Sequence, residues 1–260
     1  MRLSISPDNP HGYTRWGFAW EHVRPRMQAC LDFGCHDGRF LASLRGKQIE
    51  RLVGVDVYEE AVERGRRLYG EIEFVTMRIA EELPFANETF SCITMLDVLE
   101  HISEQNAVLA EIRRVLRANG TLIVTVPGKH LFSFLDMGNL KFRFPRLHGW
   151  YYCRKHSREA YEARYLSNPN GLIGDVSAEK RWHEHFNRGG LGELLSNAGF
   201  EVVSFDGTGF FARIIHNTMY AVRPVESLYR ALSRLSEMDA HRFESSNLFC
   251  VARKDGERRF

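Results

Sequence analysis

The chain has 260 residues, 44% of them hydrophobic and 26% charged, a balance typical of a globular protein and unlike that of a disordered chain. No apolar run approaches the roughly 18 residues that a membrane-spanning helix needs, and the first residues lack the basic segment and apolar core of a secretory signal. Five cysteines without CxxC spacing favour free thiols over a disulfide framework or a zinc knuckle, so we expect a cytoplasmic protein.

Short apolar runs alternate with helical patterns in the first half of the chain. The runs are rich in β-branched residues, as expected of strands that are covered on both faces. They lie at residues 29–33, 51–56, 72–76, 90–96 and 121–126. Helical spacing of apolar residues is found at 37–46, 58–70 and 103–120. This alternation predicts an α/β fold with a doubly wound, mostly parallel sheet that binds ligands at the carboxyl ends of its strands.

The helix over 103–120 has the clearest end signals. Ser103 is a suitable N-cap, and Asn119 with Gly120 is a suitable C-cap. We therefore expect this helix to fill the whole segment between two strands.

The regular rhythm stops after residue 127. About fifty residues without a clean period follow, and an insert of this length inside a domain is typically a lid or a binding loop. A helix over 188–199 and strands over 200–205 and 247–254 bring the expected sheet to seven strands. We expect a single domain over 1–260, with a core of 29–127, 181–206 and 246–254, a substrate lid at 128–180 and a helical insertion at 209–243.

The insert is basic and aromatic. Between residues 128 and 165 the chain carries eight Lys or Arg against three acids, and nine aromatic residues lie between Phe132 and Tyr165. Such a block suits an anionic partner with a flat or apolar part, for example a nucleotide-sugar, a glycan on a lipid carrier or single-stranded RNA. The same residues could instead be solvated surface or the packing of the lid itself. The apolar stretch 210–222 could similarly lie on a membrane surface, contact another subunit or form a buried helix.

A glycine turn follows the strand at 29–33. Gly34 and Gly38 bracket a turn that leads into a helix, an arrangement that commonly holds a nucleotide or another polar small molecule. His36 stands in the middle of this turn, and we expect it to be tolerated there with ordinary backbone dihedral angles. The turn does not match GxGxxG, which argues against a nicotinamide oxidoreductase, and the sequence has no P-loop motif.

Six motifs in this order resemble class I S-adenosylmethionine-dependent methyltransferases, and more narrowly their small-molecule, type 11-like branch. The motifs are LDFGCHDGRFL, LVGVDVYEEAV, AEELPFANETF, MLDVLEHI, EIRRVLRANGTLIVTVP and HFNRGGLGELLSNAGFEVV. The match covers residues 29–127 and, more loosely, 185–205, about half of the chain. This resemblance implies a Rossmann-like fold, S-adenosyl-L-methionine as cofactor and S-adenosyl-L-homocysteine as product.

The resemblance also places residues at the cofactor. Asp32, at the end of the first strand, would reach the methionine ammonium or hold the turn, and Gly34 and Gly38 would let the backbone approach the methionine portion. Asp56 ends the second strand 22 residues after Gly34, where an acid accepts hydrogen bonds from ribose hydroxyls. The full set expected at the cofactor is Asp32, Phe33, Gly34, Cys35, Gly38, Asp56, Val57, Ala80 and Leu96, with Met95 beside the last.

Three residues depart from the family pattern. They are His36 in the turn, Ile79 where many relatives have an acid at the adenine, and Ser91 before the fourth strand. These departures could mark a decayed turn that binds nothing, or they could be tolerated variation. We favour tolerated variation because the acids and glycines of the expected cofactor site are all present.

Two histidines are the candidate catalytic residues. Methyl transfer requires an aligned acceptor, and transfer to oxygen often benefits from a general base. His185 precedes the helix at 188–199, and His101 lies in the turn after the fourth strand, where a purely structural role is also open. His183 and His185 form an isolated HxH pair, so we expect no metal.

These inferences predict a methyltransferase that acts on a small molecule or glycan. We expect O-methylation of a sugar, a nucleotide-sugar or a lipid-linked intermediate, and the acceptor can be anionic. An RNA methyltransferase is a less favoured alternative, because the basic charge is confined to the insert. A non-catalytic binding module with the same fold is the other alternative. Peripheral membrane contact is compatible with the sequence, which does not indicate an oligomeric state.

Overall fold

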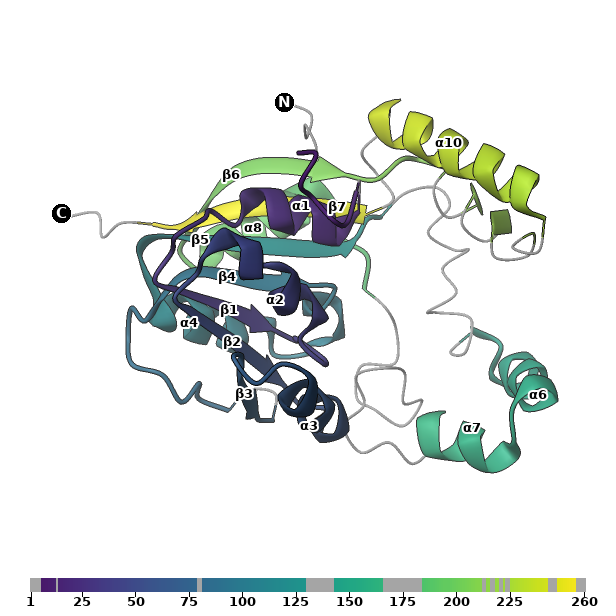
Figure 1. The fold of residues 1–260 in the computed structure, drawn as a ribbon, viewed down its shortest axis with the longest axis horizontal. Coiled ribbons are helices and arrows are strands. Elements are labelled where there is room, and N and C mark those ends of the chain that lie inside the picture. Colours follow the sequence, from purple (N-terminus) through teal and green to yellow (C-terminus); the bar gives the residue numbers. More distant parts are fainter. Residues whose placement is uncertain are drawn as a thin grey trace.

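The computed structural model describes residues 6–12, 14–78, 81–129, 143–165, 184–211, 214–215, 218–219, 222, 225–242 and 247–255. Seven strands in these residues form one sheet in the order β3-β2-β1-β4-β5-β7-β6 (Figure 1). β7 runs antiparallel to both of its neighbours, and the other neighbouring strands are parallel. The expected α/β fold with a doubly wound, mostly parallel, seven-stranded sheet is confirmed.

The strands begin and end close to the expected residues, except that β5 begins at Leu116 and was expected to begin at 121. Every residue of the central β1 is buried, because parallel strands in a doubly wound sheet are covered on both faces. The strands are β1 (Ala29–Phe33), β2 (Arg51–Asp56), β3 (Glu73–Thr76), β4 (Phe90–Leu96), β5 (Leu116–Pro127), β6 (Phe200–Gly207) and β7 (Asn247–Lys254).

Helices cover both faces of the sheet and create two hydrophobic cores. Successive side chains of a strand point to opposite faces, so Cys30 belongs to one core and Leu31 to the other. The first core is formed with α1 (Arg15–His22), α2 (Arg39–Ser43) and α3 (Glu59–Leu68), and the second with α4 (Gln105–Val115) and α8 (Arg188–Asn197). Two short 3-10 helices are η1 (Arg45–Lys47) and η2 (Leu99–His101).

The helix expected over 103–120 is shorter at both ends. α4 begins at Gln105, so Ser103 does not cap it. It ends at Val115 because Leu116 is extended, with φ −79° and ψ 134°, fully buried and already part of β5. Asn119 does adopt a left-handed φ of +59°, but it lies in the irregular beginning of β5. Burial of Leu116 in the sheet therefore overrides the local Asn-Gly stop signal.

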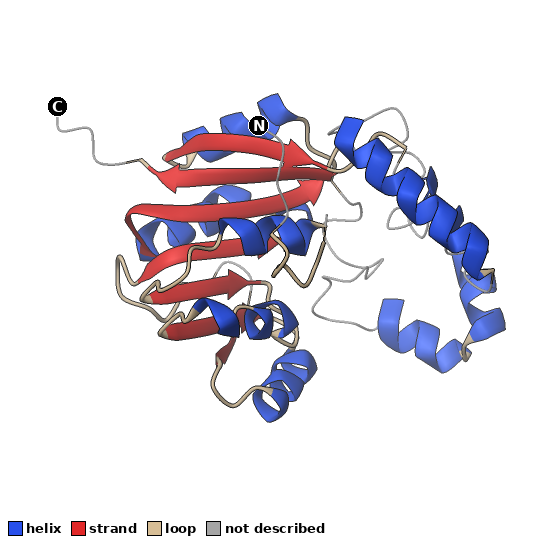
Figure 2. Cartoon of the chain, turned by 45° about the horizontal axis from the view of Figure 1, so that its top comes forward, coloured by secondary structure: helices blue, strands red, loops and turns tan. Residues whose placement is uncertain are grey.

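The segment expected to lack a regular period contains two helices. α6 (Pro145–Lys155) and α7 (Arg158–Tyr165) pack on each other, and α10 (Glu226–Arg242) lies between β6 and β7 in the chain. All three helices stand on the side toward which the parallel strands run (Figure 2).

Gly38 joins the turn after β1 to α2. It has φ +77°, and a Cβ atom at this position would lie 2.4 Å from Cζ of Phe74 in β3. The open side of Gly38 is therefore filled by the protein's own core. Glycine is required here for the backbone conformation and for the packing of Phe74.

We expect Gly38→Ala to lower the free energy of unfolding by about 2 kcal/mol, because the change adds both backbone strain and a core clash. Chemical denaturation measures the loss. Gly46→Ala is the matched control, since nothing lies within 4 Å of its added Cβ and its φ is not left-handed. Equal stabilities of the two variants would contradict this account of Gly38.

Candidate functional site

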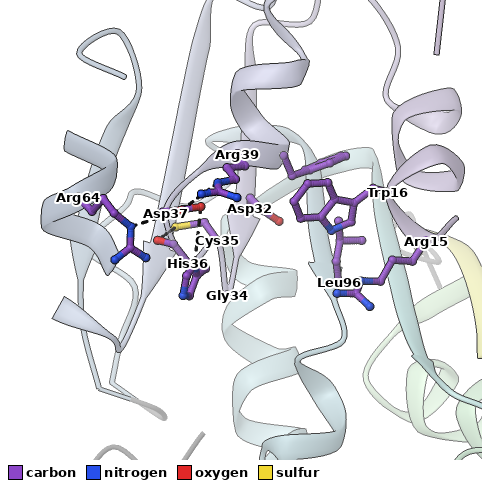
Figure 3. A pocket seen from close by; sticks show the side chains of 11 residues that line it. Arg15, Trp16, Asp32, Gly34, Cys35, His36, Asp37, Arg39, Arg64 and Leu96 are labelled. Carbon is purple, nitrogen blue, oxygen red and sulfur yellow. Dashed lines mark hydrogen bonds and ion pairs between the residues drawn. The ribbon is translucent and has the colours of Figure 1, made fainter. Parts of the chain in front are cut away.

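A cavity of about 390 Å³ lies at the carboxyl ends of β1 and β4. Chain order reverses between these two strands, and this is the point where doubly wound sheets bind ligands. The volume lies in the usual range for small-molecule sites. Figure 3 shows the Asp32 carboxylate between the glycine turn on one side and Trp16 and Leu96 on the other. The cavity is lined by Arg15, Trp16, Asp32, Gly34, Cys35, His36, Asp37, Arg39, Phe40, Arg64 and Leu96.

Asp32 is a buried acid at the bottom of this cavity. Its side chain is only 3% exposed, and Thr94 Oγ1 donates a hydrogen bond of 2.6 Å to Asp32 Oδ1. The pKa of Asp32 is raised to about 7, mainly by burial. The hydrogen bond from Thr94 lowers the pKa and the neighbouring charge of Asp56 raises it, so these two effects oppose each other. A cation beside Asp32 would supply the opposite charge that a buried carboxylate needs.

Asp56 organises the turn from the end of β2. Its Oδ2 accepts a 2.7 Å hydrogen bond from the backbone N–H of His36, and its Oδ1 accepts one of 2.9 Å from Tyr58 N–H. Gly34 in the same turn has φ +84°, and a Cβ atom there would lie 2.2 Å from Cγ2 of Val98. A carboxylate has about four acceptor sites, so Asp56 can still accept ligand hydroxyls beyond these two bonds.

We expected ordinary dihedral angles at His36, and this expectation is wrong. Its φ is +50°, in the left-handed region, which costs about 1 kcal/mol for a residue with a Cβ atom. Histidine enters this region more readily than most residues. The bond to Asp56 holds the backbone, and the imidazole stacks on Tyr58 with ring centroids 6.0 Å apart. Tertiary contacts therefore stabilise a histidine in a conformation that favours glycine.

A second acid, Asp37, has the opposite electrostatic environment. Burial alone would raise its pKa, but the charges of His36 and Arg39 and the hydrogen bond from Arg64 outweigh burial and lower the pKa below its usual range. Arg39 Nε lies 3.2 Å and Arg64 Nε 3.4 Å from Asp37 Oδ2. Asp37 therefore fixes two arginines at the wall of the cavity.

The helix α1 forms another wall, which the sequence reasoning missed. Arg15 lines the cavity, and its Nη1 lies 2.7 Å from Oδ2 of Asp97, just after β4. Trp16 packs against Phe40 of α2. The available signal was local: Thr14 accepts a hydrogen bond from Gly17 N–H and is an N-cap. Such a cap predicts the start of a helix but does not indicate where the helix packs.

The cavity brings together some of the residues that the resemblance placed at the cofactor. Asp32, Gly34, Cys35 and Leu96 line it, and Ala80 lies outside the described residues. The expected residues that do not line it are Phe33, Gly38, Asp56 and Val57. Met95 was expected beside Leu96 but is fully buried in the core, because adjacent strand residues face opposite sides of the sheet.

The two candidate bases lie at the carboxyl ends of neighbouring strands. His101 belongs to η2 after β4, and its Nε2 is 3.9 Å from Oε1 of Glu100. His185 precedes Phe186, whose backbone pairs with Gly128 after β5.

A side-chain bridge connects the two segments that carry these histidines. Gln105 Nε2 donates to Leu99 O at 3.0 Å and to Glu184 Oε2 at 2.9 Å. His183 lies outside the described residues, and within the described part of the chain no three metal-ligating side chains are grouped to hold an ion.

Comparison with known proteins decides the family. A family model described as a methyltransferase domain matches residues 18–205, more than half of the chain. The chain belongs to this family. The resemblance to class I S-adenosylmethionine-dependent methyltransferases is thereby confirmed, and S-adenosylmethionine is the cofactor that the family implies.

Relatives with curated names match parts of the chain. A Mycobacterium tuberculosis protein named "Probable S-adenosylmethionine-dependent methyltransferase" is 30% identical over 123 residues, which cover 46% of this chain and 44% of that protein. The matched region thus spans less than half of that relative's length. The ubiquinone/menaquinone biosynthesis C-methyltransferase of Cronobacter sakazakii is 26% identical over 196 residues, 69% of each chain.

Solved structures share the fold. An S-adenosylmethionine-dependent methyltransferase from Mesorhizobium loti superposes with a TM-score of 0.55 at 14% identity, over 93% of this chain and 98% of that one. The (4+2)-cyclase SpnF superposes with a TM-score of 0.53 at 18% identity, over 89% and 76% of the two chains. Because one of these neighbours is named a cyclase, the shared fold alone does not specify a reaction.

We expect Asp32→Asn to become more stable than the wild type as the pH rises from 4 to 7. Asp32 has a pKa of about 7 in the folded protein against an ordinary value of 3.8, so folding favours its protonated form and stability falls as the pH rises through this window. The asparagine stays neutral, and at pH 8 the difference should reach a few kcal/mol. Denaturant unfolding at several pH values measures the difference.

Asp37→Asn is the matched control with the opposite sign. The pKa of Asp37 is lowered in the folded protein, so its ionised form stabilises the fold above the unfolded pKa. The variant should be less stable than the wild type at pH 7 and approach it as the pH falls through the folded pKa. A pH-independent difference for Asp32→Asn would contradict the burial argument.

Proposed function

We propose that this protein transfers the methyl group of S-adenosylmethionine to a small-molecule or glycan acceptor. The observation that carries the proposal is the cavity at the ends of β1 and β4, with a buried acid, three arginines and apolar side chains around one volume. Membership of the methyltransferase family supports the cofactor assignment.

The residues of the cavity fit the polar ends of this cofactor. Asp32 would accept the methionine ammonium, since a buried carboxylate with a raised pKa gains most from an adjacent cation. Arg15 would exchange its contact with Asp97 for the methionine carboxylate. Trp16, Phe40 and Leu96 supply apolar surface. Asp56 does not line the cavity, but it lies beside the glycine turn and would accept the ribose hydroxyls through the acceptor sites that its two backbone bonds leave.

S-adenosylmethionine supplies an electrophilic methyl group on a sulfonium and leaves as the neutral thioether S-adenosylhomocysteine. The chain itself aligns the acceptor and excludes water. We place His185 as the general base, with His101 as the second candidate. Neither histidine lines the cavity, but both follow strands at the carboxyl edge of the sheet, where the cavity lies, and Gln105 joins their segments. The base takes the proton of an acceptor hydroxyl as the oxygen forms its bond to the methyl carbon.

The acceptor atom is oxygen in this proposal. Transfer to carbon is the second candidate, because the Cronobacter sakazakii relative is named a C-methyltransferase and aligns over 69% of this chain. A base that removes a proton from the acceptor serves both reactions. The fixed Arg39 and Arg64 favour an acceptor or cofactor group with negative charge near the cavity wall.

Titration calorimetry with S-adenosylhomocysteine tests the cofactor site. We expect micromolar affinity for the wild type and a loss of about tenfold or more for Asp56→Ala, which removes the expected ribose contact and two supports of the turn. Glu73→Ala is the control, since Glu73 forms a surface ion pair with Arg51 and does not support the glycine turn. Folded wild-type protein that does not bind S-adenosylhomocysteine would favour a binding module over an enzyme.

The base is tested once an acceptor is found by screening nucleotide-sugars and hydroxylated lipids. We expect His185→Asn to lower kcat about a hundredfold and to remove the acidic limb of the pH–rate profile, while the affinity for S-adenosylhomocysteine stays unchanged. His101→Asn is the paired variant. A profile altered by His101→Asn alone would reverse their roles, and two unaffected profiles would rule out both residues.

A further inference from the structure

α6 has two chemically different faces, and one of them packs on α7. His148 Nδ1 lies 3.4 Å from the hydroxyl of Tyr161, and the ring of Tyr152 contacts those of Tyr161 and Tyr165 with centroids 5.6 and 5.2 Å apart. Residues four apart lie on one side of a helix, so His148 and Tyr152 form the inner face. This aromatic cluster fixes the orientation of α6 in the helix pair.

A second face of α6 exposes large apolar side chains. Leu147 and Trp150 are 52% and 56% exposed, and Phe144 and Tyr151 are similarly open. Helical spacing places Leu147, Trp150 and Tyr151 on one arc beside the inner face, and Phe144 is the residue just before the helix. We call the surface formed by Phe144, Leu147, Trp150 and Tyr151 the α6 face. Contiguous exposed apolar residues of this size mark an interaction surface more often than inert surface.

Arginines are distributed along the α6 face. Arg154 lies on the arc of Leu147 and Trp150, with its guanidinium 4.8 Å from the centroid of the Trp150 ring, and the exposed Arg143 directly precedes Phe144. Residues 143–165 contain six Lys or Arg and two Glu, a net charge of +4 in a chain whose total is +2. The surface is therefore apolar and strongly basic, while the remainder of the chain is slightly acidic.

The helix α10 shows that this combination is not general. α10 also exposes apolar residues, among them Leu235 and Met238. Its sequence, residues 226–242, carries three Arg and three acids, so it has no net charge. Exposed apolar residues occur on both helices, but only α6 in this pair combines them with an excess of positive charge.

We propose that the α6 face docks on the surface of an anionic lipid bilayer. Trp and Tyr rings have an apolar body and a polar edge and lie well at the headgroup level, and arginine stems cover apolar surface while their guanidinium groups reach lipid phosphates. Leu147 and Phe144 extend toward the acyl chains. Leu147 cannot stack on a base and Arg154 covers one face of Trp150, which favours lipid over single-stranded RNA.

The docking is peripheral. In the described part of the chain each helix is too short or too polar to cross a bilayer. α6 stands on the side toward which the parallel strands run, the same edge at which the cavity lies (Figure 1). Contact through α6 therefore brings lipid to the side of the molecule on which the cavity lies. The docking itself does not depend on the proposed function. If that function holds, an acceptor with a lipid tail would reach the cavity from the bilayer, and this step does rest on it.

Sedimentation of the full chain with vesicles tests the proposal. We expect binding to vesicles of equal parts phosphatidylglycerol and phosphatidylcholine at low salt, and little binding to phosphatidylcholine alone. The double variant Leu147→Ser/Trp150→Ser should bind the anionic vesicles about tenfold or more weakly. Leu68→Ser on α3 is the matched control, because Leu68 is 54% exposed and lies outside the α6 face.

A charge pair provides an independent second measurement if the serine variant does not fold. Arg143→Glu/Arg154→Glu should abolish most anionic-vesicle binding, and Arg67→Glu on α3 should leave it nearly unchanged. The proposal is wrong if the wild type ignores anionic vesicles, if the α6 variants bind them as the wild type does, or if a single-stranded RNA oligomer binds and vesicles do not. Binding of S-adenosylhomocysteine, measured in the same variants, reports the proposed function separately.

Discussion

The site depends on one carboxylate that closes the turn after β1. Asp56 receives the backbone N–H groups of His36 and Tyr58, and Val55 O receives those of Gly34 and Cys35. Four donors at the carboxyl end of β1 and the start of α3 are thus satisfied by the end of β2. This arrangement holds the left-handed residues of the turn in place and positions Asp32 beneath them. Without it, the buried acid and the glycine backbone would not share one cavity.

Two acids five positions apart in the chain obtain opposite properties from their surroundings. Asp32 is buried with one hydroxyl donor and the like charge of Asp56 nearby, and its pKa rises to about 7. Asp37 is also buried, yet His36 and two arginines lower its pKa. Burial alone therefore does not set the pKa of a carboxyl group, because cationic neighbours can outweigh it. The cavity accordingly has an acid suited to a cation and a wall suited to an anion.

The sequence is informative about the parts of this protein that rest on local rules. Alternating apolar runs locate the strands, and the glycines and acids of the turn locate the ligand edge, because strand order and turn chemistry are encoded nearby in the chain. Tertiary contacts decide what was missed. The φ of His36 is imposed by Asp56 and Tyr58, α4 ends where Leu116 is buried, and Arg15 reaches the cavity only because α1 packs across the sheet. Single-sequence patterns carry no signal for such pairings.

The place of β7 has a consequence for how the chain is assembled during synthesis. β6 joins the sheet through β7 alone, since β7 lies between β5 and β6 although it follows both in the chain. The five parallel strands β1 to β5 can pair as soon as they leave the ribosome, but β6 has no sheet neighbour until residues 247–254 have emerged. β5 meanwhile presents an unpaired edge, which is exposed to wrong partners. Completion of the sheet is therefore a late step that closes this edge and fixes α8 against the core at the same time.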